Sequence, residues 1–421
     1  MLRTVLGISA DDLTGAADAA AALARPGASV AISLDIRPPT AKDERAAFAV
    51  TTNSRSLPPQ EVFDLVADSA SHLRMGGASF VFQKLDSNLR GNVGATVAAL
   101  LDIVGGPVLL APAFPLRGRT TVNATAFVDG VPVAETEMGR DPEAPVRHSH
   151  LPALLAEQWR GLTVTTCPLA VVRAGASAIR ARLEPHAVIV ADAETDADLD
   201  LLAEAVLMDP PLRAAAGSGG LAAALARRLY GPRPARTWPE ERQGPVLAVL
   251  ASSSHTLAVQ VAHADTMSDA TVVPFPCERL NWDEQPVPVL NAAIAAAVAA
   301  LTNGKDTVIH AAGPLPKVEH PVDLVVEHLA HLGFVAVKQG SPSALLLGGG
   351  ATAHEVLGVL GTRAVEIDDE PLTGIAAGTI SGGEMAARPV VLKPGAAGGE
   401  RAVVELLDYL RRRATLVETD A

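Results

Sequence analysis

Short, continuous apolar segments alternate with alanine-rich segments along almost the whole chain, and this alternation constrains the fold most. The apolar segments lack interspersed polar residues, which is typical of strands buried on both faces of a parallel sheet. In the first half they are residues 4–9, 29–34, 46–52, 79–85, 107–113 and 187–193. Segments with helical patterns lie between them, for example residues 91–104 and 196–207. Strand followed by helix, repeated, predicts an α/β fold with a mainly parallel sheet flanked by helices.

Two stretches interrupt this alternation. Residues 120–136 hold β-type residues on both sides of an Asp-Gly pair, which is typical of a hairpin, and we interpret them as a β excursion of the first domain. Residues 230–245 carry four prolines, several charges and no apolar period, which indicates a domain boundary. The pattern then resumes, with strands predicted near residues 246–251, 307–311, 343–347 and 389–393. We therefore expect two α/β domains, residues 1–235 and 246–421.

Composition excludes some classes of function. A formal net charge of −13, from 34 Lys and Arg against 47 Asp and Glu, argues against a general nucleic-acid surface, which needs clustered cations. Cys167 and Cys277 have no metal-like spacing and fit a reducing compartment better than a disulfide framework. The longest uncharged alanine-rich stretch, residues 290–304, is too short to span a bilayer, and the N-terminus meets charge before a signal-type apolar region develops. We expect a cytoplasmic protein that binds neither membrane nor nucleic acid.

Polar residues that follow the predicted strands are the candidates for chemistry, because ligands of open α/β sheets bind beyond the carboxyl ends of the strands. In the first domain these positions hold both carboxylates and cations. They are Asp11, Asp12, Asn53, Arg55, Lys84, Asp86, Ser87, Arg90, Asn92, Arg117 and Arg119. Arg and Lys hold carboxylates in charge-assisted hydrogen bonds, while Asp accepts from hydroxyls. The mixture therefore suits a small polyhydroxy acid.

Asp11 and Asp12 stand where the first strand gives way to a helix. Either could act as a general base toward a bound hydroxyl. Either could instead cap the following helix, as Asp commonly does, and one can cap while the other acts. The sequence does not choose between them.

Glycine and hydroxyl residues dominate the corresponding positions of the second domain. Serines follow its first strand, a run of glycines follows another, further glycines occupy residues 378–384, and a lysine closes the last strand. The candidates are Ser252, Ser254, Gly348, Gly349, Gly350, Gly382, Gly383 and Lys393. Glycines at strand-to-helix turns let backbone N–H groups approach an anion, and the helix N-terminus adds partial positive charge. Several such turns at one edge would cradle the phosphates of a nucleotide.

Other common motifs are absent. No GxxxxGK[ST] P-loop occurs, and the nearest dinucleotide-type pattern, GSGGLA at residues 217–222, follows PPLRAAA, which is not predicted to be a strand. A Rossmann dehydrogenase is therefore poorly supported. The eleven histidines form no HxH or HExxH pattern, so no zinc site is predicted.

Several stretches together resemble the four-carbon acid sugar kinase family, which contains threonate, erythronate and tetronate kinases. They run in order across nearly the whole chain. The matching stretches are residues 10–18, 52–56, 84–92, 111–136, 141–149, 217–225, 251–256, 345–357 and 381–399. The resemblance implies an N-terminal domain that binds an acid sugar and a C-terminal domain that binds a nucleotide. It further implies that ATP and Mg²⁺ serve to transfer a phosphoryl group to a terminal hydroxyl of the sugar acid.

The resemblance also assigns roles. It implies catalytic roles for Asp12, Asp11 and Lys84, and substrate contacts from Asp12, Arg55, Lys84, Asp86, Ser87 and Arg90. It implies that Ser252, Gly349, Gly350 and Gly383 surround ATP, and the strand-end pattern adds Ser254, Gly348, Gly382 and Lys393 to the expected nucleotide site. The sugar acid and ATP are then the expected partners, and a homodimer is an assembly left open.

The chain departs from the family's usual pattern at a few positions. Leu85 and Asn88 replace two threonines, and Ala351 replaces an acidic residue of the glycine run. Loss of a carboxylate beside the phosphates would weaken Mg²⁺ binding, unless Glu384 or Glu355 replaces it. Two alternatives therefore stay open: a catalytically degenerate sensor of a sugar acid or nucleotide, and a kinase of another hydroxy acid or polyol.

Overall fold

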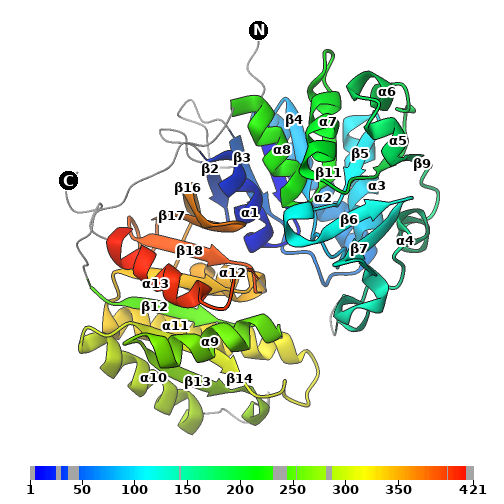
Figure 1. Ribbon diagram of the computed structural model, residues 1–421. Helices are drawn as coiled ribbons and strands as arrows, with labels where there is room; N and C mark the ends of the chain where they lie inside the picture. The colour runs from blue at the N-terminus through cyan, green and yellow to red at the C-terminus, as the bar shows by residue number, and fades with distance from the viewer. Residues whose placement is uncertain are drawn as a thin grey trace. The chain divides into compact units, whose positions relative to one another are not determined.

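The computed structural model describes residues 5–24, 30–36, 47–141, 144–230, 244–252, 254–280, 287–395 and 397–413. The chain divides into two compact units, residues 1–234 and 235–421, and each unit is an α/β domain (Figure 1). Most of the predicted linker, residues 231–243, lies outside the described residues.

The N-terminal unit is built on a parallel sheet. Its strands, in spatial order, are β2 (Val30–Ser33), β3 (Ala47–Thr51), β1 (Leu6–Ala10), β4 (Phe80–Lys84), β11 (Ala214–Gly217), β5 (Val108–Ala111), β10 (Val188–Ala191) and β9 (Val164–Cys167). Because all neighbours are parallel, the carboxyl ends of the strands meet at one edge. The chain moves from β1 outward to β2 and then returns across β1 to β4, so β1 stands at the switch point where such sheets bind ligands.

Helices cover both faces of this sheet. One face carries α1 (Leu13–Leu23), α7 (Asp196–Leu207) and α8 (Gly219–Tyr230), and the other carries α2 (Pro59–Met75) and α3 (Val93–Val104) (Figure 1). Among the shorter helices, α4 (Leu151–Gln158) precedes the outer strand β9, and α5 (Leu169–Val172) and α6 (Ala176–Arg180) follow it. Alanine makes up most of α1 and nearly all its residues are buried, so that this helix can pack closely against both β3 and α8.

A small antiparallel sheet extends from the N-terminal unit. It consists of β6 (Arg119–Val122), β7 (Thr125–Val128) and β8 (Val131–Pro132). Asp129 and Gly130 join β7 to β8, both with positive φ (50° and 80°), as the tight primed turn of a hairpin requires. The predicted β excursion at residues 120–136 is therefore confirmed.

The C-terminal unit has a mixed sheet. Its order is β13 (Thr271–Pro276), β14 (Thr307–Ala312), β12 (Val246–Leu250), β15 (Ala344–Gly348), β18 (Pro389–Lys393), β17 (Ile375–Ser381) and β16 (Ala364–Leu372). The neighbouring strands β13, β14, β12, β15 and β18 are parallel, whereas β17 runs antiparallel to both of its neighbours, β18 and β16. Helices α9 (His255–Met267) and α13 (Ala402–Arg413) pack together, as do α10 (Val287–Thr302), α11 (Pro321–Gly340) and α12 (Gly350–Val359).

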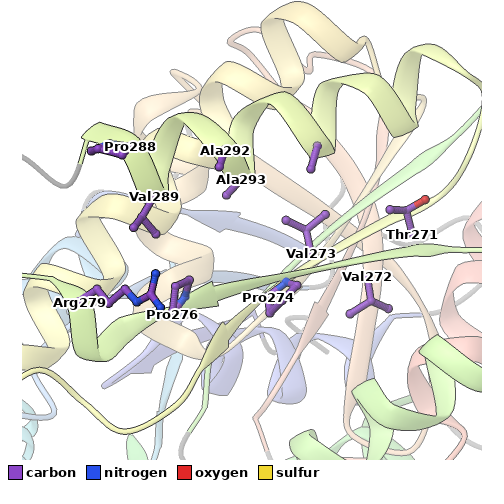
Figure 2. Close-up of a pocket in the computed structure, with 11 residues that line it drawn as sticks. Thr271, Val272, Val273, Pro274, Pro276, Arg279, Pro288, Val289, Ala292 and Ala293 are labelled. Atoms are coloured by element: carbon purple, nitrogen blue, oxygen red, sulfur yellow. The ribbon is translucent and has the colours of Figure 1, made fainter.

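A cavity of about 510 Å³ lies between the edge strand β13 and helix α10 (Figure 2). Its lining is mainly apolar, with Val273, Val289 and Ala293 among the residues that face it and Arg279 at one end. Pro274 and Pro276 belong to this strand and supply no backbone N–H, which is typical of the edge of a sheet.

The structure contains every predicted strand, but one prediction about a strand is wrong. Residues 214–217, Ala-Ala-Ala-Gly, form β11 in the middle of the N-terminal sheet, so the GSGGLA pattern does follow a strand. Small side chains hide such a strand from a search for large β-branched residues. Both cysteines are free and buried. No helix among the described residues is long and apolar enough to cross a membrane.

Candidate functional sites

Asp12 caps helix α1. Its backbone is extended (φ −145°, ψ 161°), and its carboxylate accepts hydrogen bonds from the Gly15 N–H (2.6 Å) and the Thr14 hydroxyl (2.9 Å). A Cβ added to Gly15 would lie 2.5 Å from Oδ1 of Asp12, so only glycine leaves room for this cap. The geometry therefore gives the cap to Asp12 and leaves Asp11 outside it.

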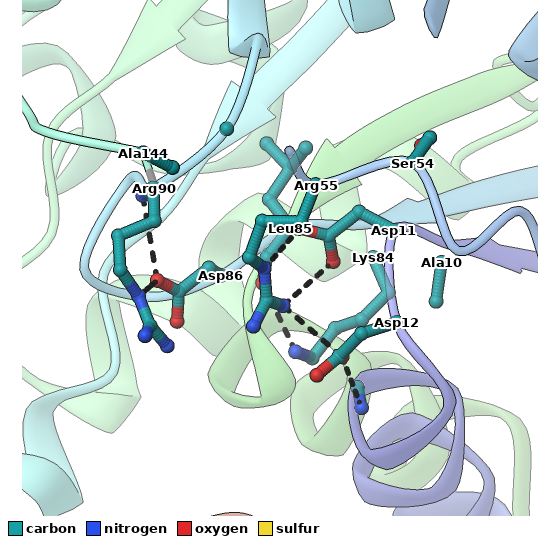
Figure 3. A network of polar contacts seen from close by, with 12 residues as sticks. Ala10, Asp11, Asp12, Ser54, Arg55, Lys84, Leu85, Asp86, Arg90 and Ala144 are labelled. Carbon is teal, nitrogen blue, oxygen red and sulfur yellow. Dashed lines mark hydrogen bonds and ion pairs between the residues drawn. The ribbon is translucent and has the colours of Figure 1, made fainter. Parts of the chain in front are cut away.

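Arg55 joins the loop after β3 to the paired carboxylates (Figure 3). Its Nε and Nη2 donate to the two oxygens of Asp11 at 2.7 and 3.0 Å, and Nη2 also lies 3.0 Å from Oδ1 of Asp12. The carbonyl of Asp11 accepts from the N–H of Ser54 at 3.0 Å, which ties this loop to the end of β1. Arg55 is therefore neutralised by the protein's own carboxylates.

The two carboxyl groups have opposite pKa shifts. Burial raises the pKa of Asp11 above its usual value, and Arg55 offsets this only in part. Burial acts in the same direction on Asp12, but Arg55, Lys84 and the hydrogen bonds from Thr14 and Gly15 outweigh it, so the pKa of Asp12 is lowered. Asp12 is thus firmly ionised, while Asp11 takes up a proton more readily.

Lys84 lies buried at the end of β4, with its ammonium near Asp18 of α1. Its Nζ donates to the Leu85 carbonyl at 3.0 Å and lies 3.5 Å from Oδ2 of Asp18. A Cβ on Gly219 would collide with the Asp18 carboxylate, so this acid faces the first turn of α8. The Asp18 carboxylate therefore occupies the position at the glycine turn after β11 where a dinucleotide-binding protein would hold a phosphate. The sequence reading did not single out Asp18.

The turn that follows β4 carries Asp86, Ser87 and Arg90. The N–H of Leu89 bonds to the Asp86 carbonyl at 2.9 Å, and Leu89 has a left-handed backbone (φ 64°) with a buried side chain. Nε of Arg90 donates to Asp86 at 2.7 Å (Figure 3). Burial opposes ionisation of Asp86, yet Arg90 and Arg55 outweigh it and hold its pKa well below the usual range. The turn is strained but held by a buried leucine and an ion pair.

The structure brings most of the predicted sugar-site residues together at one edge of the N-terminal sheet. Loops after β1, β3 and β4 supply Asp11, Asp12, Arg55, Lys84, Asp86 and Arg90 (Figure 3). Ser87 lies half-buried in the turn between Asp86 and Arg90. The arrangement can accept hydrogen bonds from hydroxyls and place a buried ammonium beside them.

In the C-terminal unit, three strand ends meet at the carboxyl edge. Leu250 stands opposite Gly348, and Gly348 opposite Lys393. The strands β12, β15 and β18 therefore deliver their following turns to the same place. These turns hold Ser252, Ser254, Gly348, Gly349, Gly350 and Lys393.

The turns are packed too closely for side chains. Gly349 has φ 94° and its N–H donates to the Lys393 carbonyl at 3.1 Å. A Cβ on Gly349 would collide with the Ala251 carbonyl, and a Cβ on Gly395 would collide with the Ser252 hydroxyl. Backbone N–H groups here can approach an anion closely, as phosphate loops do.

Two buried side chains shape the loop of residues 394–399. Nζ of Lys393 donates to the carbonyls of Pro394 and Gly395 at 3.2 and 3.0 Å. Nε2 of Gln260, on α9, donates to the carbonyls of Ala397, Gly398 and Gly399 at 3.0, 3.1 and 2.9 Å.

In a trans peptide the N–H of the next residue points away from the carbonyl, so the N–H groups of Gly398 and Gly399 point away from the Gln260 amide. Gln260 was missed by the sequence reading. A polar residue on the buried face of α9, beside Val261 and Leu257, is the signal that could have found it.

Gly382 and Gly383 do not lie with these turns in this unit, so their predicted contact with ATP stays a prediction. They follow β17, which is antiparallel to β18, and Thr379 of β17 stands opposite Pro389, the first residue of β18. They therefore lie at the amino edge, where a Cβ on Gly383 would collide with the Leu360 carbonyl. Glu384 lies there too, with its carboxylate 3.0 Å from Nζ of Lys338, so it does not replace the acid missing at Ala351.

Comparisons with known proteins support this two-part reading. A sugar-binding N-terminal domain model matches residues 6–225, and a nucleotide-binding C-terminal domain model matches residues 247–403. The chain superposes on the crystal structure of a Salmonella typhimurium protein described as a putative tRNA synthase, with a TM-score of 0.78 at 22% identity, covering 96% of this chain and 99% of the other. At that identity the likeness shows the fold alone.

The curated relatives are named as kinases of four-carbon acids. A D-threonate kinase of Bordetella bronchiseptica is 31% identical, covering 97% of this chain and 98% of the relative. A D-erythronate kinase of Heliobacterium modesticaldum is 28% identical, covering 96% of each. A 3-oxo-tetronate kinase of Methylobacterium radiotolerans is 31% identical, covering 89% of this chain and 92% of the relative. With both domain models matched and these relatives aligned over nearly their full lengths, the chain belongs to the four-carbon acid sugar kinase family.

Proposed function

We propose that this protein transfers the terminal phosphoryl group of ATP to a hydroxyl of a four-carbon sugar acid such as threonate, erythronate or 3-oxo-tetronate. The observation that carries the proposal is the buried cluster of Asp11, Asp12, Arg55 and Lys84 at the switch point of the N-terminal sheet. The names of the curated relatives support the same reaction and substrate class. We assign sugar binding to residues 1–235 and nucleotide binding to residues 246–421.

Asp11 is our candidate for the base that takes the proton of the attacking hydroxyl. Each of its oxygens accepts one N–H from Arg55, which leaves a lone pair on each for a hydroxyl. The carboxylate of Asp12 has less free acceptor capacity, because it accepts from Gly15 and Thr14 and pairs with Arg55. The raised pKa of Asp11 also suits proton transfer better than the lowered pKa of Asp12.

Lys84 is our candidate for offsetting negative charge during transfer. Its ammonium is buried, lies 3.5 Å from Asp18 and acts electrostatically on Asp12. Phosphoryl transfer depends mainly on positioning and on neutralising charge. A buried cation that acts on Asp12, the neighbour of the proposed base, supplies neutralising charge without reorganising.

On the nucleotide side, the turns around Ser252, Gly349 and Lys393 and the loop 394–399 would hold the phosphates of ATP. The glycine positions fit this role, since a Cβ at Gly349 or Gly395 would collide with the Ala251 carbonyl or the Ser252 hydroxyl and disturb the turns that present backbone N–H groups. Mg²⁺ usually enters kinases on the phosphates with only one or two carboxylates. In the described part of the chain no group of three His, Cys, Asp or Glu side chains is placed to hold a metal.

A coupled assay of ADP release with Mg-ATP tests the proposal against the stereoisomers of threonate and erythronate, their 3-oxo forms and the matching tetritols. We expect turnover with one or more acids and a loss of about 10²- to 10⁴-fold in kcat for Asp11→Asn. Asp12→Asn is the matched control, because asparagine can still cap α1, and its kcat should fall less.

The pH dependence of kcat is a second test of the role of Asp11. Asp11 must be ionised to accept a proton, so activity should fall as the pH falls through a value above the ordinary 3.8. No turnover across the panel, with ATP still raising the melting temperature, would replace the kinase with a binding protein of the same fold.

A further inference from the structure

Arg119 differs from the other cations at the carboxyl edge of the N-terminal sheet. Within the described residues, the other four each have a carboxylate oxygen within 4 Å: these are Arg55, Lys84, Arg90 and Arg117. The hydrogen bonds that the Arg119 side chain makes to described residues go to neutral acceptors. Its Nε donates to Oδ1 of Asn88 at 3.1 Å, and its Nη1 donates to the Arg117 carbonyl.

The backbone around Arg119 is fixed. Arg119 is the first residue of β6, and it exchanges two hydrogen bonds with Phe114, from the Phe114 N–H at 2.8 Å and from its own N–H at 3.1 Å. Between them lies a single 3-10 turn, Pro115–Arg117, closed by Gly118 with φ 69°. The guanidinium therefore projects from a rigid loop that follows β5.

Asn88 comes from a different loop, the strained turn after β4. Leu89, the next residue, has a left-handed backbone, and its side chain is buried in the core. That anchor fixes the turn and with it the position of Asn88. The hydrogen bond from Arg119 to Asn88 thus joins the loop after β5 to the loop that holds Asp86 and Arg90.

No carboxylate among the described residues forms an ion pair with Arg119, although three act on it from farther away. Burial lowers the pKa of this arginine, while Asp129, Asp86 and Glu137 act in the opposite direction without any of them forming an ion pair with it. Its two neutral acceptors also use only part of the donor capacity of a guanidinium, which can hold a carboxylate with two parallel hydrogen bonds. A half-buried cation in this state favours an anionic ligand.

We propose that Arg119, held in position by Asn88, binds the carboxylate of the sugar acid, and that Arg55 does not. Arg55 already donates to both oxygens of Asp11 and also pairs with Asp12. The assignment rests on the proposed function and adds the residue that separates acids from neutral polyols. Asn88, one of the positions where the chain departs from its family, is the positioning residue.

The test compares Arg119→Gln with the wild type in calorimetric binding of the preferred acid and in kinetics. We expect the Kd and KM for the acid to rise about 10- to 100-fold, with kcat within about threefold. Binding of the matching tetritol, which lacks the carboxylate, should not change. Arg228→Gln is the matched control, because Arg228 is an exposed arginine on α8 that pairs with Glu204.

Two further variants keep the proposal falsifiable if glutamine disturbs the fold. Arg119→Lys keeps the charge but loses the paired geometry, so it should lose part of the affinity. Asn88→Ala removes the acceptor and should raise the KM for the acid alone, while Asn88→Thr retains an oxygen and should restore most of the affinity.

An unchanged Kd for the acid in Arg119→Gln and Arg119→Lys would overturn the assignment. Failure of the wild type to phosphorylate any acid would instead refute the proposed function. In that case, loss of acid binding in Arg119→Gln and its retention in Arg228→Gln would still support the role of Arg119.

Discussion

The carboxyl edges of the two sheets differ in the groups that form them: side chains in one and backbone in the other. In the N-terminal unit, buried or half-buried charged side chains form ion pairs, such as Asp11 with Arg55 and Lys84 with Asp18. In the C-terminal unit, backbone groups form the edge, and the buried cation Lys393 donates to carbonyls of the loop it begins. The first edge can distinguish ligands by where hydroxyls and charges sit, whereas the second can hold any group with the shape of a phosphate. The two should therefore fail differently when they are mutated.

Removing the buried lysine should have the largest effect on stability. Lys84→Met leaves Asp18 and Asp12 without their ammonium partner, and breaking a buried ion pair costs about 3–5 kcal/mol. Urea unfolding of the variant measures the loss. Adding Asp18→Asn should recover part of it, because the uncompensated charge is then also removed. If the double variant is no more stable than Lys84→Met, the pair is not what stabilises this edge.

At the carboxyl edge of the C-terminal sheet, adding a methyl group to Gly349 should reduce ATP binding most. Gly349→Ala forces a left-handed backbone on alanine and drives its Cβ into the Ala251 carbonyl, at a cost of about 1–3 kcal/mol in strain alone. We expect the ATP-induced rise in melting temperature to disappear, while calorimetric binding of the sugar acid persists.

The matched control is Gly358→Ala in the same helix, where an added Cβ meets no atom within 4 Å. This change should be neutral or slightly stabilising, by about 0.5–1 kcal/mol, because alanine favours helices. Equal loss of ATP binding in both variants would show that α12 as a whole, and not the turn, is responsible.

The smallest effect should come from the side chain that supports the loop of residues 394–399. Gln260→Ala removes three hydrogen bonds to loop carbonyls but leaves the glycines in place. We expect the KM for ATP to rise about tenfold with little change in the KM for the sugar acid. Gln60→Ala, at an exposed site on α2, is the control. A change confined to the sugar-acid KM would contradict the division of labour between the two edges.

The fold could be predicted from sequence wherever strands are made of large apolar residues. The strand β11 was not predicted because three alanines and a glycine have low β propensity, although the strand is fully buried between β4 and β5. The edge of the sheet that Gly382 and Gly383 reach could not be predicted, because a glycine run looks the same at either edge and the antiparallel course of β17 decides it.

For the candidate site, the sequence predicts which residues lie near one another better than it predicts what each residue does. Strand-end position was enough to find Asp11, Asp12, Arg55 and Lys84. The choice of Asp12 as the cap depends on its extended backbone and its bond to Gly15, which no residue pattern reveals. Likewise, Arg55 and Arg119 look equivalent in sequence, and they differ only in the acids that the fold places beside them.

The position of β11 also affects how the protein is made. This strand lies between β4 and β5 in the sheet but follows both by a long stretch of chain. A ribosome releases β4 and β5 well before the strand that must separate them, and domains tend to fold as units during synthesis. The N-terminal sheet can therefore reach its final order only after residue 217 has emerged. Until then the facing edges of β4 and β5 stay open to wrong partners, so a nascent chain paused before this point is the form most in need of a chaperone.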